Sequence, residues 1–274
     1  MSNISLTASM RSNLLSLQNT QSLMDTTQER LSTGKKVNSA IDNPSSYYTA
    51  QSLSNRASDL SSLLDSMGQA IQTIKAADEG IESITSFAQQ AKAIAQSALD
   101  ASDAAEKASY MDQFNKIREQ INSLASDSGY KGVNLLAGDK LTVVFNEGRT
   151  SDLEITGKDA STTGLGIDTA AAWNTGAAAD QIAAINSAIT DVEGAISTLR
   201  TWSSEFGNNY SIVQSREDFT ENLINVLTEG SDKLTLADMN EESANMLALQ
   251  TRQQLAINSL SLASQAAQSV LKLF

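Results

Sequence analysis

The chain has 274 residues, a formal net charge of −13 and 41% hydrophobic side chains, which is enough to bury a core. Cysteine and histidine are both absent, which excludes disulfides, zinc sites, cysteine nucleophiles and Ser-His-Asp triads. A single proline in a chain of this length is typical of long helices with few tight turns.

The negative charge is unevenly distributed. Residues 1–40 carry four basic and two acidic side chains, and residues 236–274 carry two basic and three acidic ones, so the middle holds nearly all the excess acid. An acidic body repels nucleic acid and anionic membranes, and we expect neither as a partner. The nearly neutral, apolar ends suit packing against copies of the chain.

No targeting or membrane segment is expected. The first 20 residues lack the charged start and apolar run of a signal peptide, because Arg11 lies in the middle among Ser and Asn. Uninterrupted apolar runs are only a few residues long, far short of a bilayer-spanning helix.

Residues 1–33 are expected to form a helix with one apolar face. The apolar side chains recur at spacings of three, four and seven residues, which is the pattern of a coiled-coil seam. The predicted seam residues are Met10, Leu14, Leu17, Met24 and Leu31. Thr20 or Gln21, and then Gln28, occupy the weaker seam positions.

Residues 34–44 are expected to connect this helix to the next. Gly34 ends the first helix, since glycine is the usual residue just past a helix C-terminus. The residue before Pro44 is disfavoured in the helical conformation, so the next helix begins near residue 45. The connector residues that we single out are Gly34, Asn38, Asp42 and Pro44.

Residues 45–230 contain the larger helical part of the chain. The first helix has an apolar stripe from Leu53 to Ala98, running through Asp78 and Phe87. The phase of this stripe slips near Asp78–Gly80, which predicts a local change of winding.

A turn at 100–107 leads into a shorter helix, whose apolar residues are Tyr110, Phe114, Ile117, Ile121 and Leu124. The last long helix of this part runs from Ile182, includes Trp202 in its packed face and stops near Gly230. Residues 231–235 then connect it to the C-terminal helix.

Residues 129–176 differ in composition, because they contain eight of the fourteen glycines. Two short stretches of β character, 140–146 and 151–156, predict a hairpin at about 140–156. Residues 157–176 are interpreted as a variable loop, in which Trp173 is expected to cover the hairpin.

Residues 236–274 have the most regular apolar pattern, at heptad spacing and without any Gly or Pro. The predicted seam residues are Met246, Leu249, Ala256, Leu260, Ala263, Val270 and Phe274. A helix this long needs a partner for its stripe, and residues 1–33 supply one. The predicted fold is therefore mainly α: a long antiparallel coiled coil or bundle formed by the N- and C-terminal segments, with a small β-hairpin mid-chain.

Three sets of motifs resemble bacterial flagellin. Gln28–Asn43 is similar to the family pattern RLSSGxRINSAxDD, and Tyr130–Leu136 is similar to FNGxNLL. Ala248–Leu255 and Ser261–Gln265 resemble the closing helix of the family. The resemblance covers residues 1–157 and 177–274 and is greatest to the compact flagellins of alphaproteobacteria. It implies a filament subunit; the hook–filament junction protein, which shares the terminal heptads, is the alternative.

The resemblance also implies a division into domains. Residues 1–33 and 236–274 correspond to an inner core domain that contains the polymerisation interface. Residues 34–44 and 231–235 correspond to spoke linkers. Residues 45–230 correspond to an outer-tube domain, and the loop at 157–176 is too short for an additional surface domain.

Partners and location follow from the same resemblance. The chain is expected to polymerise with itself, alone or with other flagellins, in the extracellular filament. Its other expected partners are an export chaperone, the type III export apparatus, the filament cap and hook-junction proteins. We expect no cofactor, no metal and no enzymatic activity, since the H-E-x-x-H peptidase of some flagellins requires histidine. Ala91 and Lys92 stand where innately recognised flagellins carry Arg and Glu, which predicts weak immune-receptor recognition.

Two hypotheses remain for the terminal helices. They either close into a bundle within one chain, or fluctuate in the monomer and become ordered on polymerisation. Their Ala-, Ser- and Gln-rich seams bury little apolar area, which favours the second hypothesis.

Overall fold

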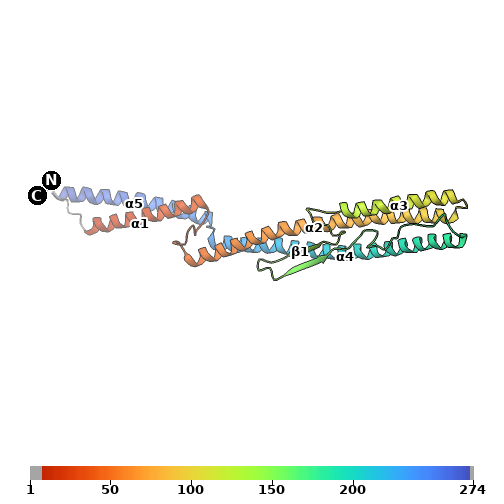
Figure 1. The fold of residues 1–274 in the computed structure, drawn as a ribbon. Coiled ribbons are helices and arrows are strands. Elements are labelled where there is room, and N and C mark those ends of the chain that lie inside the picture. The colour runs from red at the N-terminus through yellow and green to blue at the C-terminus, as the bar shows by residue number, and fades with distance from the viewer. Residues whose placement is uncertain (1–7, 272–274) are drawn as a thin grey trace. The chain divides into compact units, whose positions relative to one another are not determined.

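The computed structural model describes residues 8–271 (Figure 1). These residues form five helices and one two-stranded antiparallel sheet. In chain order the elements are α1 (Ala8–Thr33), α2 (Pro44–Asp100), α3 (Ala104–Asp127), β1 (Lys140–Val144), β2 (Asp152–Thr156), α4 (Ala178–Thr235) and α5 (Met239–Leu271). The predicted fold class, mainly helical with a hairpin mid-chain, is confirmed.

The chain divides into two compact units. Unit 1 consists of residues 1–55 and 226–274, and unit 2 consists of residues 56–225. Unit 1 therefore contains the beginning of α2 and the end of α4 in addition to α1, the connector and α5. This division lies further into the two long helices than the domain boundaries predicted at 44 and 231.

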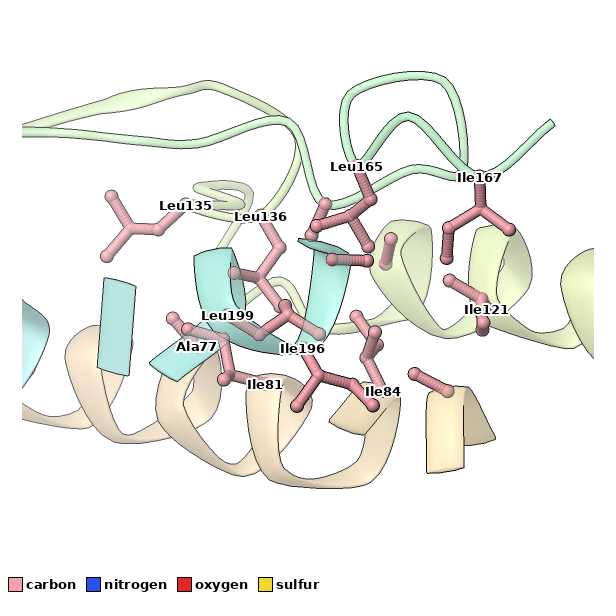
Figure 2. Close-up of a cluster of buried hydrophobic side chains, with 14 of the residues drawn as sticks. Ala77, Ile81, Ile84, Ile121, Leu135, Leu136, Leu165, Ile167, Ile196 and Leu199 are labelled. Carbon is pink, nitrogen blue, oxygen red and sulfur yellow. The ribbon is translucent and has the colours of Figure 1, made fainter. Parts of the chain in front are cut away.

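In unit 2, α2 and α4 run antiparallel and share an apolar core. Ser203 Oγ donates a hydrogen bond to Asp78 Oδ1 at 2.9 Å, and Lys92 Nζ lies 2.7 Å from Glu193 Oε1. Residue numbers thus rise along α2 as they fall along α4. Figure 2 shows Ile81 of α2 close to the α4 side chains of this core.

The apolar stripe of α2 continues without interruption through Asp78–Gly80, so the predicted change of winding is wrong. The buried position is Ala77 rather than Asp78, and Ala88 rather than Phe87. Two sets of buried residues repeat every seven positions: Leu60, Met67, Ile74, Ile81, Ala88 and Ala95, and then Ala70, Ala77, Ile84, Ala91 and Ala98. Because the small Ala77 and Ala88 take the buried positions in place of Asp78 and Phe87, the seven-residue repeat stays unbroken.

The predicted variable loop packs tightly against α3. We call residues 160–173 the strap. Thr162 is 1% exposed, and its N–H and Oγ1 donate hydrogen bonds to Asn122 Oδ1 at 2.8 and 3.0 Å. Arg118 Nε donates to the carbonyl oxygen of Ile167 at 2.8 Å. Figure 2 shows strap residue Ile167 close to Ile121 of α3.

Trp173 lies at the end of the strap and is 1% exposed. Its ring packs on Phe114 of α3, with the ring centroids 5.2 Å apart. It therefore covers α3, and the expectation that it covers the hairpin is wrong. Trp202 is partly buried against the unit 2 core, as expected.

The hairpin pairs Lys140 with Thr156 at one end and Val144 with Asp152 at the other. Val143 and Ile155 point into the core. At the turn, Asn146 Oδ1 accepts a hydrogen bond from the Thr150 N–H at 2.9 Å, which is a side-chain substitute for a backbone turn contact.

Candidate assembly interface

In unit 1, α1 packs along α5 in the antiparallel direction (Figure 1). Two polar contacts join the helices: Arg30 Nη1 lies 2.9 Å from Glu242 Oε1, and Gln253 Nε2 donates to Gln21 Oε1 at 2.8 Å. We call the strip of less exposed residues between the two helices the seam. On α1 it comprises Met10, Leu17, Met24 and Leu31, with Asn13, Thr20 and Thr27; on α5 it comprises Met246, Gln253 and Leu260, with Leu249, Ala256 and Ala263.

Nine of the twelve apolar residues predicted for the interface lie in this seam: Met10, Leu17, Met24, Leu31, Met246, Leu249, Ala256, Leu260 and Ala263. Leu14 does not, because it lies on the flank of α1 and is 36% exposed. The side chain of Val270 and all of Phe274 fall outside the described residues. Contact across the seam is within one chain, so any role between copies remains a prediction.

Small polar residues alternate with the large apolar residues along the α1 seam. Thr20 is 2% exposed and Thr27 is 6% exposed, whereas the alternative positions Gln21 and Gln28 are exposed to solvent. Thr20 Oγ1 donates to the carbonyl oxygen of Ser16 at 2.8 Å, which satisfies the hydroxyl and frees its methyl group to pack. The seven-residue spacing of Asn13, Thr20 and Thr27 was the signal that could have identified them.

The Arg30–Glu242 ion pair was not anticipated. The side chain of Glu242 is only 9% exposed, and that of Arg30 is 38% exposed. Glu242 lies seven residues before Leu249, so it occupies a seam position at the start of α5. A charged residue within an apolar seam fixes the register of two helices better than it stabilises them.

The connector after α1 pairs with the chain between α4 and α5. Gly34 has φ +71°, the left-handed conformation that ends many helices. The Lys36 N–H donates to the Thr235 carbonyl oxygen at 2.7 Å, and the Ala237 N–H donates to the Gly34 carbonyl oxygen at 3.0 Å. Backbone hydrogen bonds therefore hold the segment that follows α1 against the segment that joins α4 to α5.

The linker predicted at 231–235 is helical, and this prediction is wrong. α4 continues through Gly230 to Thr235, and the break falls at residues 236–238. Gly230 packs closely instead of ending the helix, since a Cβ there would lie 3.4 Å from Leu53 Cδ1. α5 accordingly begins at Met239, with Asp238 Oδ1 accepting from the Asn240 N–H at 2.9 Å as its cap.

Asp42 organises the connector at 34–44. Its Oδ2 accepts hydrogen bonds from the N–H groups of Asn38 and Ser39, each at 2.9 Å. The Ser39 and Asn38 hydrogen bonds, in that order, hold the pKa of Asp42 below its usual value. Pro44 is the first residue of α2, where its missing N–H costs nothing.

Unit 1 also exposes large apolar side chains that the seam does not cover. On α5, Leu247, Leu255 and Leu262 are 67%, 64% and 68% exposed. They are seven or eight residues apart and lie on the side of the helix opposite the seam, because successive residues turn by about 100°. These three leucines form a second apolar face on α5 that has no partner within the described residues. On α1, Leu15 is 60% exposed and lies on the side away from α5.

Comparison with known proteins gives the family. The family model described as the bacterial flagellin N-terminal helical region matches residues 4–140, and the model of the C-terminal helical region matches residues 183–274. The chain belongs to the bacterial flagellin family. It is 32% identical to flagellin FljK of Caulobacter vibrioides, over 95% of this chain and 94% of that protein. It is also 32% identical to a flagellin of Brucella melitensis, over 95% of each chain.

The crystal structure of Bacillus cereus flagellin is similar, with 14% identity and a TM-score of 0.47 over 57% of this chain and 88% of that chain. The flagellin relatives are structural proteins, and this flagellin is a subunit of the bacterial flagellar filament. The junction-protein alternative is not favoured. Polymerisation and the extracellular filament accompany membership of the family.

The described residues contain neither a helix that could span a membrane nor a cluster that could bind a metal ion. Among residues 8–271, no helix is both long and apolar enough to span a bilayer. In the same described residues, His, Cys, Asp and Glu do not gather in any group of three or more that could hold a metal ion.

Proposed function

We propose that unit 1 is the assembly element of this flagellin. The α1–α5 coiled coil forms the inner core of the filament, where the outer leucines of α5 pack against neighbouring copies. Residues 34–44 and 236–238 form the spoke, and unit 2 forms the outer tube. The observation that carries this proposal is the exposed apolar face of α5, formed by Leu247, Leu255 and Leu262.

Apolar burial provides the driving force. Fully burying one leucine contributes about 1.5–3 kcal/mol, so three leucines on each copy form a substantial contact when repeated along a filament. Exposed leucines aligned along one face of a helix present apolar surface that a neighbouring copy can cover. The seam and the exposed leucines therefore have different roles. The seam holds α1 and α5 of one copy together, and the leucines join one copy to the next.

The seam itself is thin, which supports ordering on assembly. Apart from Met10, Thr20, Thr27 and Glu242, its residues remain partly exposed, and Asn13, Gln253, Ala256 and Ala263 among them have little apolar area to bury. Two helices with so little buried area are weakly stable alone. Neighbouring copies supply the missing contacts, so the terminal helices become fully ordered in the filament.

The partners implied by this role handle the subunit before assembly. An export chaperone masks the leucine face of α5, the type III export apparatus passes the unfolded chain, and cap and hook-junction proteins meet it at the growing filament. The lack of cysteine supports unfolded export, because no disulfide has to be broken or reformed.

The test is seeded polymerisation of a triple variant, Leu247→Gln, Leu255→Gln and Leu262→Gln. We expect its critical concentration, measured by sedimentation, to rise at least about tenfold, which corresponds to 1.4 kcal/mol of lost contact energy. Its monomer helicity by circular dichroism should be unchanged, because these side chains face away from the seam. A matched control replaces the exposed Ile182 and Ile212 of unit 2 by Gln. A triple variant that polymerises like the wild type rules the proposal out.

A further inference from the structure

Methionine is concentrated on the two terminal helices. The chain has seven methionines and no cysteine. Of the six methionines in the described residues, four lie on α1 and α5: Met10, Met24, Met239 and Met246. The other two, Met67 and Met111, lie in unit 2. Methionine is therefore the side chain of unit 1 that a mild oxidant modifies first.

The antiparallel register brings Met24 and Met246 to the same stretch of the seam. The ion pair and the glutamine hydrogen bond between α1 and α5 fix which residues face one another. Met24 and Met246 both lie between these two contacts, on the seam side of their helices. Their thioethers thus pack within the apolar layer that holds α1 and α5 together.

Exposure decides which sulfur atoms a small oxidant can reach. Met239 is 45% exposed, while Met24 and Met246 are half-buried in a seam only two helices thick. Met10 is 7% exposed and Met67 is fully buried in the unit 2 core. Met111 is half-buried in unit 2, which makes it a matched internal control for Met24 and Met246.

We infer that Met24 and Met246 are oxidation sites at which a peroxide turns the free subunit from assembly-competent to assembly-incompetent. The thioether sulfur attacks one peroxide oxygen, the O–O bond breaks and an S–O bond forms. The methionine loses two electrons, and hydrogen peroxide is reduced to water. This inference rests on the proposed role of unit 1 in assembly.

The sulfoxide acts by polarity. A sulfoxide is a polar, chiral group in place of a flexible apolar one, and it disrupts packed methionine surfaces. Inside the seam, the sulfoxide oxygen cannot form hydrogen bonds with water unless α1 and α5 separate. Oxidation therefore favours the separated state of these two helices. In an assembled filament, neighbouring copies cover unit 1 and slow the reaction, which confines the switch to free subunits.

The experiment treats the full-length monomer with hydrogen peroxide and follows each methionine by peptide mass spectrometry. We expect Met239, Met24 and Met246 to be oxidised before Met10 and Met67. Sulfoxide at Met24 and Met246 should raise the critical concentration for seeded polymerisation about tenfold, as expected for burying an unpaired polar group. Methionine sulfoxide reductases A and B with a thiol reductant should restore assembly.

Leucine variants separate the sites. A double variant, Met24→Leu and Met246→Leu, conserves side-chain volume and should still polymerise after peroxide treatment. Met111→Leu should remain as sensitive as the wild type. The inference is overturned if the treated double variant loses assembly as the wild type does, or if wild-type subunits oxidised at both sites polymerise normally.

The leucine-face triple variant, without oxidant, tests the assembly role separately. If that variant polymerises normally, the proposed function fails. If it does not polymerise but oxidised wild-type subunits do, only the oxidation switch fails.

Discussion

Replacing Arg30 by alanine should destabilise unit 1, because the mostly buried carboxylate of Glu242 loses its only ion-pair partner among the described residues. We expect a loss of about 1–3 kcal/mol, at the lower end of values for buried pairs since Arg30 is partly exposed. Thermal unfolding followed by circular dichroism measures it. Lys233→Ala is the control, because its ion pair with Glu229 is solvent-exposed and should contribute little to stability. Equal effects of the two variants would contradict the buried role of Glu242.

Gly80→Ala tests close packing within unit 2. An alanine normally stabilises a helix by about 1 kcal/mol relative to glycine. Here the added Cβ would collide with Ser128 Oγ and lie 2.6 Å from Leu136 Cδ1. We therefore expect a net loss of about 1–3 kcal/mol, as for other overpacked sites, measured by urea denaturation. Gly207→Ala, with open space around its Cβ, should be neutral or stabilising. If Gly80→Ala stabilises the protein instead, the side chains of Ser128 and Leu136 must move aside at little energetic cost.

The connector element should respond to acid through Asp42. The pKa of this carboxyl is lowered in the folded chain by the Ser39 and Asn38 hydrogen bonds. A carboxyl of lowered pKa contributes stability above its unfolded pKa, and that contribution is lost as the pH falls through the folded value. The connector should therefore be unchanged from neutral pH to about pH 4 and loosen below it.

An NMR titration of the Asn38 and Ser39 amide protons tests this expectation. Both shifts should follow one ionisation, at a pH below the usual aspartate value. Asp42→Asn should abolish the titration, and an unchanged titration in that variant would assign it to another group.

The strap should detach when its contact with α3 is removed. Asn122→Ala leaves the buried N–H and hydroxyl of Thr162 without their acceptor. We expect a loss of about 2–3 kcal/mol and a red shift of Trp173 fluorescence as its ring leaves Phe114. Gln113→Ala, on the exposed side of the same helix, should change neither quantity. Unaltered stability in Asn122→Ala would mean that apolar contacts alone hold the strap.

At the scale of the whole molecule, the two units differ greatly in core size. The unit 2 core is a continuous cluster that joins α2, α3, α4, the hairpin and the strap, whereas unit 1 depends on a thin seam. We expect two thermal transitions in the monomer, with unit 1 unfolding first. Arg30→Ala should lower only the first transition, and Gly80→Ala should lower only the second. A single transition shifted equally by both variants would show that α2 and α4 couple the units into one cooperative block.

Periodic apolar patterns were sufficient to predict the helices and their order. The heptads of α1 and α5 placed nine of the predicted residues in the seam, and the β character of 140–146 and 151–156 predicted the hairpin. These features are encoded locally, since a 3.5- or 2-residue period follows directly from the geometry of a helix or strand. Gly34 and Pro44 likewise marked the ends of the connector through their own backbone preferences.

The tertiary structure decided what local patterns leave ambiguous. Gly230 could end a helix or allow close packing, and only the proximity of Leu53 shows that it packs inside α4. Either Ala77 or Asp78 could occupy the buried stripe of α2. In the folded chain Ala77 is buried, while Asp78 accepts a hydrogen bond from Ser203 of α4. The strap and the Arg30–Glu242 pair join residues far apart in sequence, so no local period reveals them. The sequence alone therefore determined the helices, their amphipathic faces and the family. The folded chain decided the register, the buried polar contacts and which apolar residues remain exposed, because these depend on partners that only the tertiary structure brings together.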